Sequence, residues 1–267
     1  MSSFASRILV TVVALPVVLY VVWLGGWWLT GLAIVGALIA MHELYVMARS
    51  LRPLVPAGYV GAILSLVGAQ AGGFEWMLAG ALATLPLAFV LYGVAETRQS
   101  ATVAIGTTVL AVLWIPVALG HLLLLRDIPE HGRLMVFTVL LAIFADSTFA
   151  YLIGRAIGRH RLAPAISPGK TIEGFLAGAI AAVAVTFFAL YEERNDFLVI
   201  WEMLVLGVVL ASAETIGDLF ESAIKRDLHV KDSGRLLAGH GGMLDRIDSL
   251  LFAGPAAFYA IVAFGYG

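Results

Sequence analysis

The amino-acid sequence predicts an all-α, polytopic bundle of transmembrane helices. Of its 267 residues, 61% are hydrophobic and only 13% are charged, and the mean hydropathy is +0.98. Soluble domains carry about 25% charged residues, so this composition is typical of an integral membrane protein. The apolar runs are about 17–25 residues long, the length that a helix needs to cross a hydrocarbon core of roughly 30 Å. Strict alternation of apolar and polar residues is absent, which argues against a β-barrel.

We expect about nine transmembrane spans, separated by turns rich in glycine and proline. Their approximate ranges are 8–24, 28–47, 57–72, 75–93, 101–125, 134–153, 172–191, 197–217 and 246–265. The first apolar run follows Arg7 as in a signal peptide, but it lacks a small-residue cleavage site and is interpreted as a span. The chain contains no cysteine, so neither disulfides nor thiolate metal sites are available.

Polarity divides the chain into two predicted regions. Residues 1–133 hold the first five spans and are almost uniformly apolar. Residues 134–267 hold the last four spans and two polar segments, 154–171 and 218–245, so we expect the catalytic chemistry here. His42 and Glu43 close the second span and are interpreted as ordinary interfacial polar residues, with a supporting role at a site as the alternative.

The distribution of Lys and Arg predicts a cytoplasmic N-terminus. With that orientation, thirteen basic residues lie in cytoplasmic segments and three lie outside. Cytoplasmic loops of membrane proteins carry such an excess of Lys and Arg. Both long polar segments are therefore expected on the cytoplasmic side, where nucleotides are available.

The first polar constellation begins inside the sixth span. Asp146 lies deep in an apolar run, where a carboxylate is costly and usually faces a bundle interior, a cation or a water-filled cavity. A protonated or hydrogen-bonded structural role is the alternative. Gly174 and Gly178 are four residues apart in the next span, a spacing that allows close helix packing.

The segment Ser-Pro-Gly-Lys-Thr-Ile-Glu-Gly, residues 167–174, is interpreted as a phosphate-contacting loop. Lys170 and Thr171 stand at the start of the seventh span, where free backbone N–H groups favour anions. Gly-Lys-Thr suggests a Walker A motif, but Pro164 occupies the position that this motif requires to be glycine, so it is not a P-loop. A plain interfacial turn with a lysine reaching for the membrane surface is the alternative.

The second constellation, residues 214–248, contains seven carboxylates, five Lys or Arg and five glycines. One predicted helix face carries Glu214, Asp218, Glu221, Ser222 and Lys225, at spacings of three or four residues. Neighbouring carboxylates oppose helix formation unless a cation lies between them, and Mg²⁺ binds one or two carboxylates together with phosphate oxygens.

Two more carboxylates, Asp245 and Asp248, are predicted on one face at the start of the ninth span. Together with the first group they could converge on one ion or two. Glycines 239, 241 and 242 flank His240 in a turn that can expose N–H groups to an anion. His240 itself could be a donor, a phosphate ligand or a brace. A polybasic segment that attracts anionic lipid is the alternative, but it leaves the interleaved acids unexplained.

Many of these residues match a known pattern. The matching positions are Ser222, Lys225, Arg226, Lys231, Asp232, Gly234, Leu237, His240, Gly241, Gly242, Asp245, Arg246 and Asp248. They resemble the signature of the phosphatidate cytidylyltransferases, also called CDP-diacylglycerol synthases. Upstream, Asp146, Ala150-Tyr151, Gly154-Arg155 and residues 167–174 resemble the other motifs of that family. The resemblance covers the C-terminal half, whereas the first five spans match only in being hydrophobic.

The resemblance implies a multi-pass enzyme of the cytoplasmic membrane, often dimeric. Such an enzyme would convert CTP and phosphatidate to CDP-diacylglycerol and pyrophosphate with Mg²⁺, and Asp218 and Asp245 would be the metal-binding carboxylates. Two positions depart from the family pattern. Ala238 stands where Pro or Gly is usual, and Gly169 stands where a second lysine is common.

We therefore expect in-line attack of the lipid phosphate on the α-phosphorus of CTP, with positioning and charge neutralisation carrying most of the rate. Candidate catalytic residues are Asp218, Asp245, Lys225, Arg226, Lys231, His240 and Asp248. Candidate substrate- and cofactor-binding residues are Ser167, Lys170, Thr171, Glu173, Ser222, Asp232, Gly241, Gly242 and Asp146. Candidate metal ligands are Asp218, Asp245 and Glu221, for Mg²⁺, with a second cation left open. The expected partners are both substrates, the bilayer and a second copy of the chain, without nucleic acid.

Three alternatives remain open from the sequence. An ion-coupled transporter would use Asp146 and Glu214 as coupling groups, but it predicts repeats and broken helices and leaves residues 218–248 unexplained. A CDP-alcohol phosphotransferase would share the lipid and the metal, but its opening motif of Asp-x2-Asp-Gly-x2-Ala-Arg is missing. A non-catalytic lipid-binding scaffold would bind anionic membranes without consuming CTP.

Overall fold

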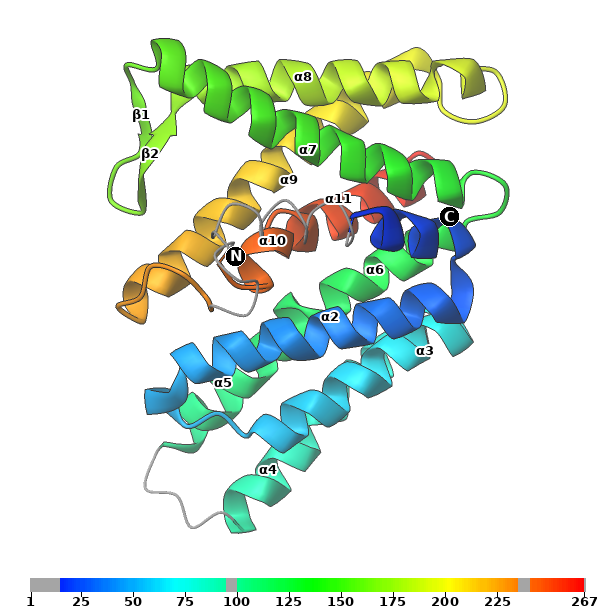
Figure 1. The fold of residues 1–267 in the computed structure, drawn as a ribbon. Coiled ribbons are helices and arrows are strands. Elements are labelled where there is room, and N and C mark those ends of the chain that lie inside the picture. Colours follow the sequence, from blue (N-terminus) through cyan, green and yellow to red (C-terminus); the bar gives the residue numbers. More distant parts are fainter. Residues whose placement is uncertain (1–14, 95–99, 235–240, 267) are drawn as a thin grey trace. The chain divides into compact units, whose positions relative to one another are not determined.

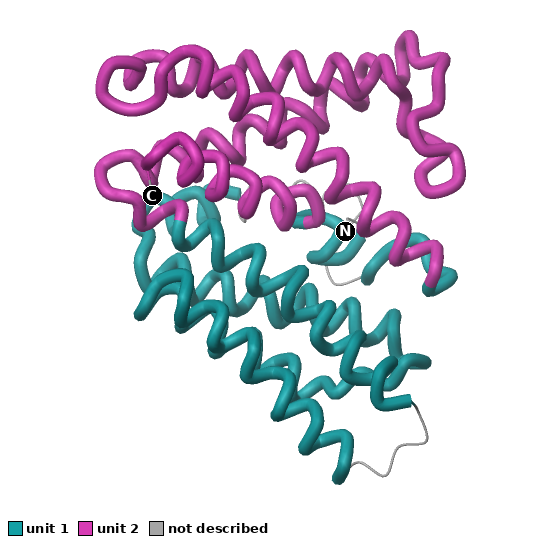
Figure 2. Tube along the Cα trace, turned by 180° about the vertical axis from the view of Figure 1, so that it is seen from behind, with its two compact units in different colours: residues 1–124, 228–247 teal, residues 125–227, 248–267 magenta. Residues whose placement is uncertain are grey.

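The computed structural model describes residues 15–94, 100–234 and 241–266. The predicted all-α class is confirmed, because almost every described element is a helix. The chain forms two compact units (Figure 2). Unit 1 comprises Met1–Leu124 and Leu228–Ile247, and unit 2 comprises Leu125–Asp227 and Asp248–Gly267. The polar segment around Ser233 and Asp245 thus belongs with the N-terminal helices, although it follows the eighth predicted span in sequence.

Unit 1 contains most of the N-terminal apolar helices (Figure 1). A short apolar helix, Leu15–Leu24, precedes the labelled elements. These elements are α2 (Gly26–Met47), the 3₁₀ turn η1 (Arg49–Leu51), α3 (Val55–Leu82), α4 (Thr84–Val94), α5 (Ala101–Trp114), the greater part of α6 (Pro116–Arg126) and the single turn α10 (Leu244–Ile247).

The apolar stretch Val55–Val94 is a helical hairpin. At 1.5 Å per residue its 40 residues would extend about 60 Å as one straight helix, twice the thickness of a hydrocarbon core. Gly73 interrupts the helix with φ 74° and ψ −157°, a conformation that side chains other than glycine rarely adopt. Gly80 lies against the backbone of Leu64, so the two halves pack side by side. Two spans with a turn at Gly73 were predicted for this stretch.

Unit 2 holds the C-terminal helices and a small antiparallel hairpin (Figure 1). Its elements are α7 (Gly132–Ile157), β1 (Arg161–Ala163), β2 (Ser167–Thr171), α8 (Ile172–Leu190), the 3₁₀ turn η2 (Tyr191–Glu193), α9 (Ile200–Asp227) and α11 (Leu250–Ala263). The β1–β2 hairpin was not predicted, because segment 154–171 was expected as a loop. Arg161 pairs with Thr171, and Ala163 pairs with Ser167. The two strands are too short to produce a periodic sequence signal.

Small residues allow α7 and α8 to pack closely, as predicted from the glycine spacing. A Cβ atom at Gly174 would lie 2.7 Å from the Ala150 carbonyl oxygen, and one at Gly178 would collide with the Asp146 carboxylate. Close backbone approach without side chains is a common way to pack helices in membranes. It places Asp146 directly against the α8 backbone.

The chain is a multi-pass membrane protein. By length and composition, seven helical stretches of the described residues could cross a membrane, and one of these is the Val55–Val94 hairpin. The total of nine spans and the cytoplasmic N-terminus stay predictions, since residues 1–14, including Arg7, lie outside the described part.

Candidate functional site

A cavity of about 650 Å³ that is lined in part by charged side chains lies within unit 2. It is lined by α7, the β1–β2 hairpin, the start of α8 and the middle of α9. Three cationic side chains face it, from Arg155, Arg161 and Lys170, together with the carboxylates of Glu214 and Asp218. A cavity with charges of both signs inside a hydrophobic helix bundle is expensive to maintain and marks a functional site.

An ion pair joins the two polar constellations inside this cavity. Lys170 Nζ, at the end of β2, lies 2.8 Å from Asp218 Oδ2, on α9. The two side chains remain 22% and 35% exposed, so the pair is open to the cavity. The structure thus brings together the residues predicted to contact phosphate and metal in unit 2.

The phosphate-loop candidates divide by role. Ser167 and Lys170 line the cavity, whereas Thr171 caps α8 by accepting the Gly174 N–H at 3.1 Å. The Glu173 carboxylate accepts the backbone N–H groups of Arg159 and His160 at 3.1 and 3.2 Å. Glu173 therefore holds the entry of the hairpin against the start of α8.

Two buried acidic side chains lie on α7 and α9, Asp146 on α7 and Glu214 on α9. Glu214 is 4% exposed and accepts a hydrogen bond from Ser147 Oγ at 2.6 Å. Asp146 is fully buried, and within the described part of the chain neither of its carboxylate oxygens has a hydrogen-bond partner. A buried carboxylate without a donor is costly, so Asp146 remains a candidate for a functional group.

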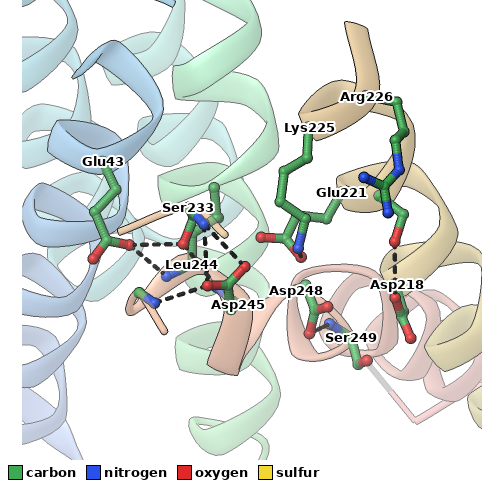
Figure 3. Close-up of polar contacts among 12 residues, drawn as sticks. Glu43, Asp218, Glu221, Lys225, Arg226, Ser233, Leu244, Asp245, Asp248 and Ser249 are labelled. Carbon is green, nitrogen blue, oxygen red and sulfur yellow. Dashed lines mark hydrogen bonds and ion pairs between the residues drawn. The ribbon is translucent and has the colours of Figure 1, made fainter. Parts of the chain in front are cut away.

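The C-terminal half of α9 presents its polar side chains on one face, as predicted. Ser222 Oγ donates to Asp218 Oδ1 at 3.3 Å, and Lys225 Nζ pairs with Glu221 Oε2 at 2.8 Å (Figure 3). Both are contacts between residues four apart, which share a helix face. Arg226 Nε donates to the carbonyl of Ile166, next to β2, at 3.5 Å.

The predicted ninth span is interrupted near its start. α10 ends at Ile247, and α11 begins at Leu250, with Asp248 and Ser249 in a turn between them. Asp248 Oδ1 accepts the Ser249 N–H at 2.7 Å, and the Asp218 carboxylate lies nearby. Asp245 and Asp248 were predicted on one continuous helix face. Asp245 lies in α10 and Asp248 lies in the turn that follows it, so the predicted helix is interrupted at Asp248 and Ser249, and the common face stays a prediction.

A second polar cluster lies within unit 1 and is centred on Glu43 and Asp245 (Figure 3). Asp245 Oδ2 accepts the backbone N–H groups of Gly242 at 2.8 Å and Ser233 at 3.1 Å. Glu43, on α2, accepts the N–H groups of Met243 and Leu244, each at 2.9 Å. The N–H groups of Gly242, Met243 and Leu244 are therefore donated to carboxylates of the protein itself.

The predicted site residues divide between the two units. Unit 2 contains Asp146, Ser167, Lys170, Thr171, Glu173, Asp218, Glu221, Ser222, Lys225, Arg226 and Asp248. Unit 1 contains Lys231, Asp232, Gly241, Gly242 and Asp245. Asp218 and Asp245 belong to different units, so their sharing of one cation stays a prediction. His240 lies outside the described residues.

Glu43 was interpreted as an ordinary interfacial residue, with a supporting role at a site only as the alternative, but it is 3% exposed and its carboxylate accepts the Leu244 N–H next to Asp245. The available signal was a carboxylate placed before the end of an apolar span, but interfacial residues give the same pattern. The cavity-lining roles of Arg155 and Arg161 were also missed as individual assignments. Arg155 stood out only as part of the Gly154-Arg155 motif of the resembled family, and Arg161 only as one of the basic residues of segment 154–171.

The bundle and its charged cavity define a multi-pass membrane enzyme. Residues 5–264 match the model of the cytidylyltransferase family, so the chain belongs to that family. The resemblance seen in the motifs is confirmed by curated relatives named phosphatidate cytidylyltransferase. The Staphylococcus haemolyticus protein is 34% identical over 93% of this chain and 95% of its own length. The Bacillus subtilis protein is 30% identical over 99% and 100%, and that of Staphylococcus aureus strain COL is 34% identical over 93% and 95%.

Proposed function

We propose that this enzyme transfers the cytidylyl group of CTP to phosphatidate, forming CDP-diacylglycerol and pyrophosphate on the cytoplasmic side of the membrane. The observation that carries the proposal is the charged cavity of unit 2, with its Lys170–Asp218 pair, in a chain of the cytidylyltransferase family. The names of the full-length relatives specify phosphatidate as the acceptor.

The cations of the cavity suit phosphate groups. The guanidinium groups of Arg155 and Arg161 can each form two parallel hydrogen bonds to phosphate oxygens, and Lys170 supplies a mobile point charge. The apolar helices around the cavity would leave the acyl chains of a lipid substrate in the bilayer. The site is thereby suited to a substrate that is anionic at one end and apolar at the other.

The carboxylates of unit 2 fit Mg²⁺ when substrate completes its coordination. Within the described residues, no group of three or more His, Asp or Glu is arranged to hold a metal ion alone. Mg²⁺ ordinarily binds one or two carboxylates and takes its other ligands from water and substrate phosphates. Asp218 opens to the cavity, with Glu221 and Asp248 nearby, so the available oxygen donors match that requirement. When bound, the ion would neutralise negative charge on the phosphates of CTP.

The proposed reaction is an in-line displacement. An oxygen of the phosphatidate phosphomonoester forms a bond to the α-phosphorus of CTP, and the bond from that phosphorus to the β-bridging oxygen breaks. The nucleophile is already an anion, so no protein base has to remove a proton. The two anionic substrates would be held in contact by the side chains of Lys170, Lys225, Arg226 and Lys231. Asp218 and Asp245 would be metal ligands. Pyrophosphate would leave with the electron pair of the broken bond.

The direct assay follows label from CTP into lipid. Purified protein in detergent micelles with phosphatidate should convert α-³²P-labelled CTP into a chloroform-extractable product in the presence of Mg²⁺. Labelled lipid should be absent after treatment with EDTA and should return when Mg²⁺ is restored. Lipid labelling that is equally fast with EDTA would contradict the metal requirement, and consumption of CTP without labelled lipid would contradict the acceptor.

A homodimer is a further proposal based on the resemblance to the family. Mass measurement of the detergent-solubilised protein by light scattering, corrected for bound detergent, should give twice the chain mass of 28.4 kDa. A mass equal to a single chain at assay concentrations, with full activity, would contradict it.

A further inference from the structure

The Glu43 carboxylate lies at the end of α2 and is almost completely buried, with 3% of the residue exposed. Glu43 Oε1 accepts the Met243 N–H at 2.9 Å, and Oε2 accepts the Leu244 N–H at 2.9 Å and Ser233 Oγ at 3.2 Å. This buried carboxyl group thus accepts three hydrogen bonds, and such bonds are stronger when the acceptor is a carboxylate than when it is neutral.

Glu43 holds both ends of one segment. Ser233 and Gly234 precede residues 235–240, and Gly242, Met243 and Leu244 follow them. A Cβ at Gly234 would lie 2.6 Å from Glu43 Oε1, and one at Gly242 would collide with Oε2. The two glycines therefore allow the chain to approach the carboxylate from both sides.

The same segment positions Asp245. Ser233 donates its N–H to Asp245, while its Oγ donates to Glu43 and accepts the Asp245 N–H at 3.4 Å (Figure 3). Gly242, which packs against Glu43, donates its N–H to Asp245 Oδ2. Ser233 and Gly242, which both donate to the Asp245 carboxylate, thus also lie against Glu43.

We propose that Glu43 is a positioning residue that holds Ser233 and the turn Gly242–Leu244 in the form that presents Asp245 to the metal and nucleotide. The inference rests on the proposed function, in which Asp245 is a metal ligand. Glutamine has almost the same size but offers one acceptor oxygen and one NH₂ group. In Glu43→Gln, that NH₂ group must face either the Met243 N–H or the Leu244 N–H and Ser233 pair, so one side of the network is lost.

A purely structural role for Glu43 predicts a different outcome. Loss of a buried anchor would lower the fraction of folded protein and kcat together, while the folded molecules would bind metal normally. A positioning role predicts weaker metal binding by protein that is still folded. Substitution of groups that orient metal ligands typically costs 10- to 100-fold in metal affinity.

The test measures Mn²⁺ binding directly, without turnover. Purified wild type, Glu43→Gln, Asp245→Asn and Glu202→Gln are titrated with Mn²⁺ in the presence of a non-hydrolysable CTP analogue, and free Mn²⁺ is followed by electron paramagnetic resonance. Glu202 is the matched control. It is also a buried carboxylate, 8% exposed, that accepts a backbone N–H at 2.9 Å, from Val199 at the start of α9.

We expect Asp245→Asn to weaken Mn²⁺ binding most strongly and Glu43→Gln to raise the Mn²⁺ dissociation constant about 10-fold or more. Glu202→Gln should bind as the wild type does. Wild-type Mn²⁺ affinity in Glu43→Gln, together with a loss in Asp245→Asn, would overturn the positioning role and leave the proposed function standing. Unchanged binding in Asp245→Asn would instead contradict the metal role of Asp245.

Two further variants keep the test decisive if Glu43→Gln folds poorly. Glu43→Asp keeps the charge at shorter reach and should give an intermediate Mn²⁺ affinity. Ser233→Ala removes the hydroxyl that joins Glu43 to Asp245 and leaves Glu43 in place. It should also weaken Mn²⁺ binding, and its effect should not add to that of Glu43→Gln, because residues in one network are coupled. Additive effects would contradict the shared network.

Discussion

At the scale of single residues, the proposed reaction depends on charged side chains that are held in contact inside an apolar bundle. Lys170 and Asp218 form an ion pair at 2.8 Å that is open to the cavity, so each can exchange its partner for substrate phosphate or for a cation. An isolated pair of this kind adds little stability when it is solvated. Its value lies in placing opposite charges where a metal–nucleotide complex could bind.

Asp218→Asn should abolish most turnover without unfolding the protein. The asparagine amide is neutral and cannot replace the charge of the carboxylate beside a cation. Loss of one group that stabilises the transition state typically lowers kcat by about 100- to 1,000-fold. The radiolabelled CTP assay measures the loss, and size-exclusion chromatography reports folding. Asp227→Asn, at the exposed end of the same helix, is the control and should retain wild-type activity. Comparable activity of Asp218→Asn and Asp227→Asn would contradict the role of Asp218.

Lys170→Ala should raise the KM for substrate by about 10-fold or more, since charge-assisted hydrogen bonds contribute roughly 1.5–3 kcal/mol. Lys170→Arg retains the charge and should recover part of the affinity. Steady-state kinetics with CTP and phosphatidate varied separately would show which substrate Lys170 contacts. A change in neither KM would contradict phosphate binding by this loop.

At the scale of elements, glycine contacts determine how α7 and α8 meet. The Asp146 carboxylate occupies the space where a side chain at Gly178 would lie. Gly178→Ala therefore overpacks the interface, and such changes typically cost about 1–3 kcal/mol of unfolding free energy.

A matched pair of glycine substitutions tests this packing in a thermal-shift assay. Gly178→Ala should lower Tm, whereas Gly31→Ala on α2 should leave it unchanged or raise it. Among the described residues, no atom outside the neighbouring helical backbone lies within 4 Å of a Cβ built at Gly31. Equal Tm values for both variants would contradict the close approach of α7 to α8.

At the scale of the whole molecule, the sequence predicted the class of fold well and the polar site only in part. Apolar run lengths identified the helices, and the glycines between residues 57 and 93 identified a hairpin turn, because both signals are local. Glu43 and Asp245 are 202 positions apart in sequence but belong to one network. No local pattern reports such a contact. The β1–β2 hairpin was missed for the opposite reason, since its strands are too short for a periodic signal.

Membrane topology is testable because the chain has no cysteine, so every introduced cysteine is the only thiol. Ala165→Cys in the turn of the β1–β2 hairpin and Asn195→Cys after η2 are both at exposed positions. In right-side-out vesicles, a membrane-impermeant maleimide should label Asn195→Cys and should label Ala165→Cys only after permeabilisation. The reverse pattern would place the cavity on the outer face, away from CTP.

A double-mutant cycle of Mn²⁺ binding with Asp218→Asn and Asp245→Asn shows whether these two carboxylates bind the same cation. If both carboxylates bind one metal–nucleotide complex, each single variant lowers Mn²⁺ affinity at the same site. The double variant then loses less than the sum of the two free-energy changes. Two outcomes would contradict a shared cation. One is that the losses of Mn²⁺ binding free energy add, at two independently occupied sites. The other is that either single variant binds Mn²⁺ with wild-type affinity.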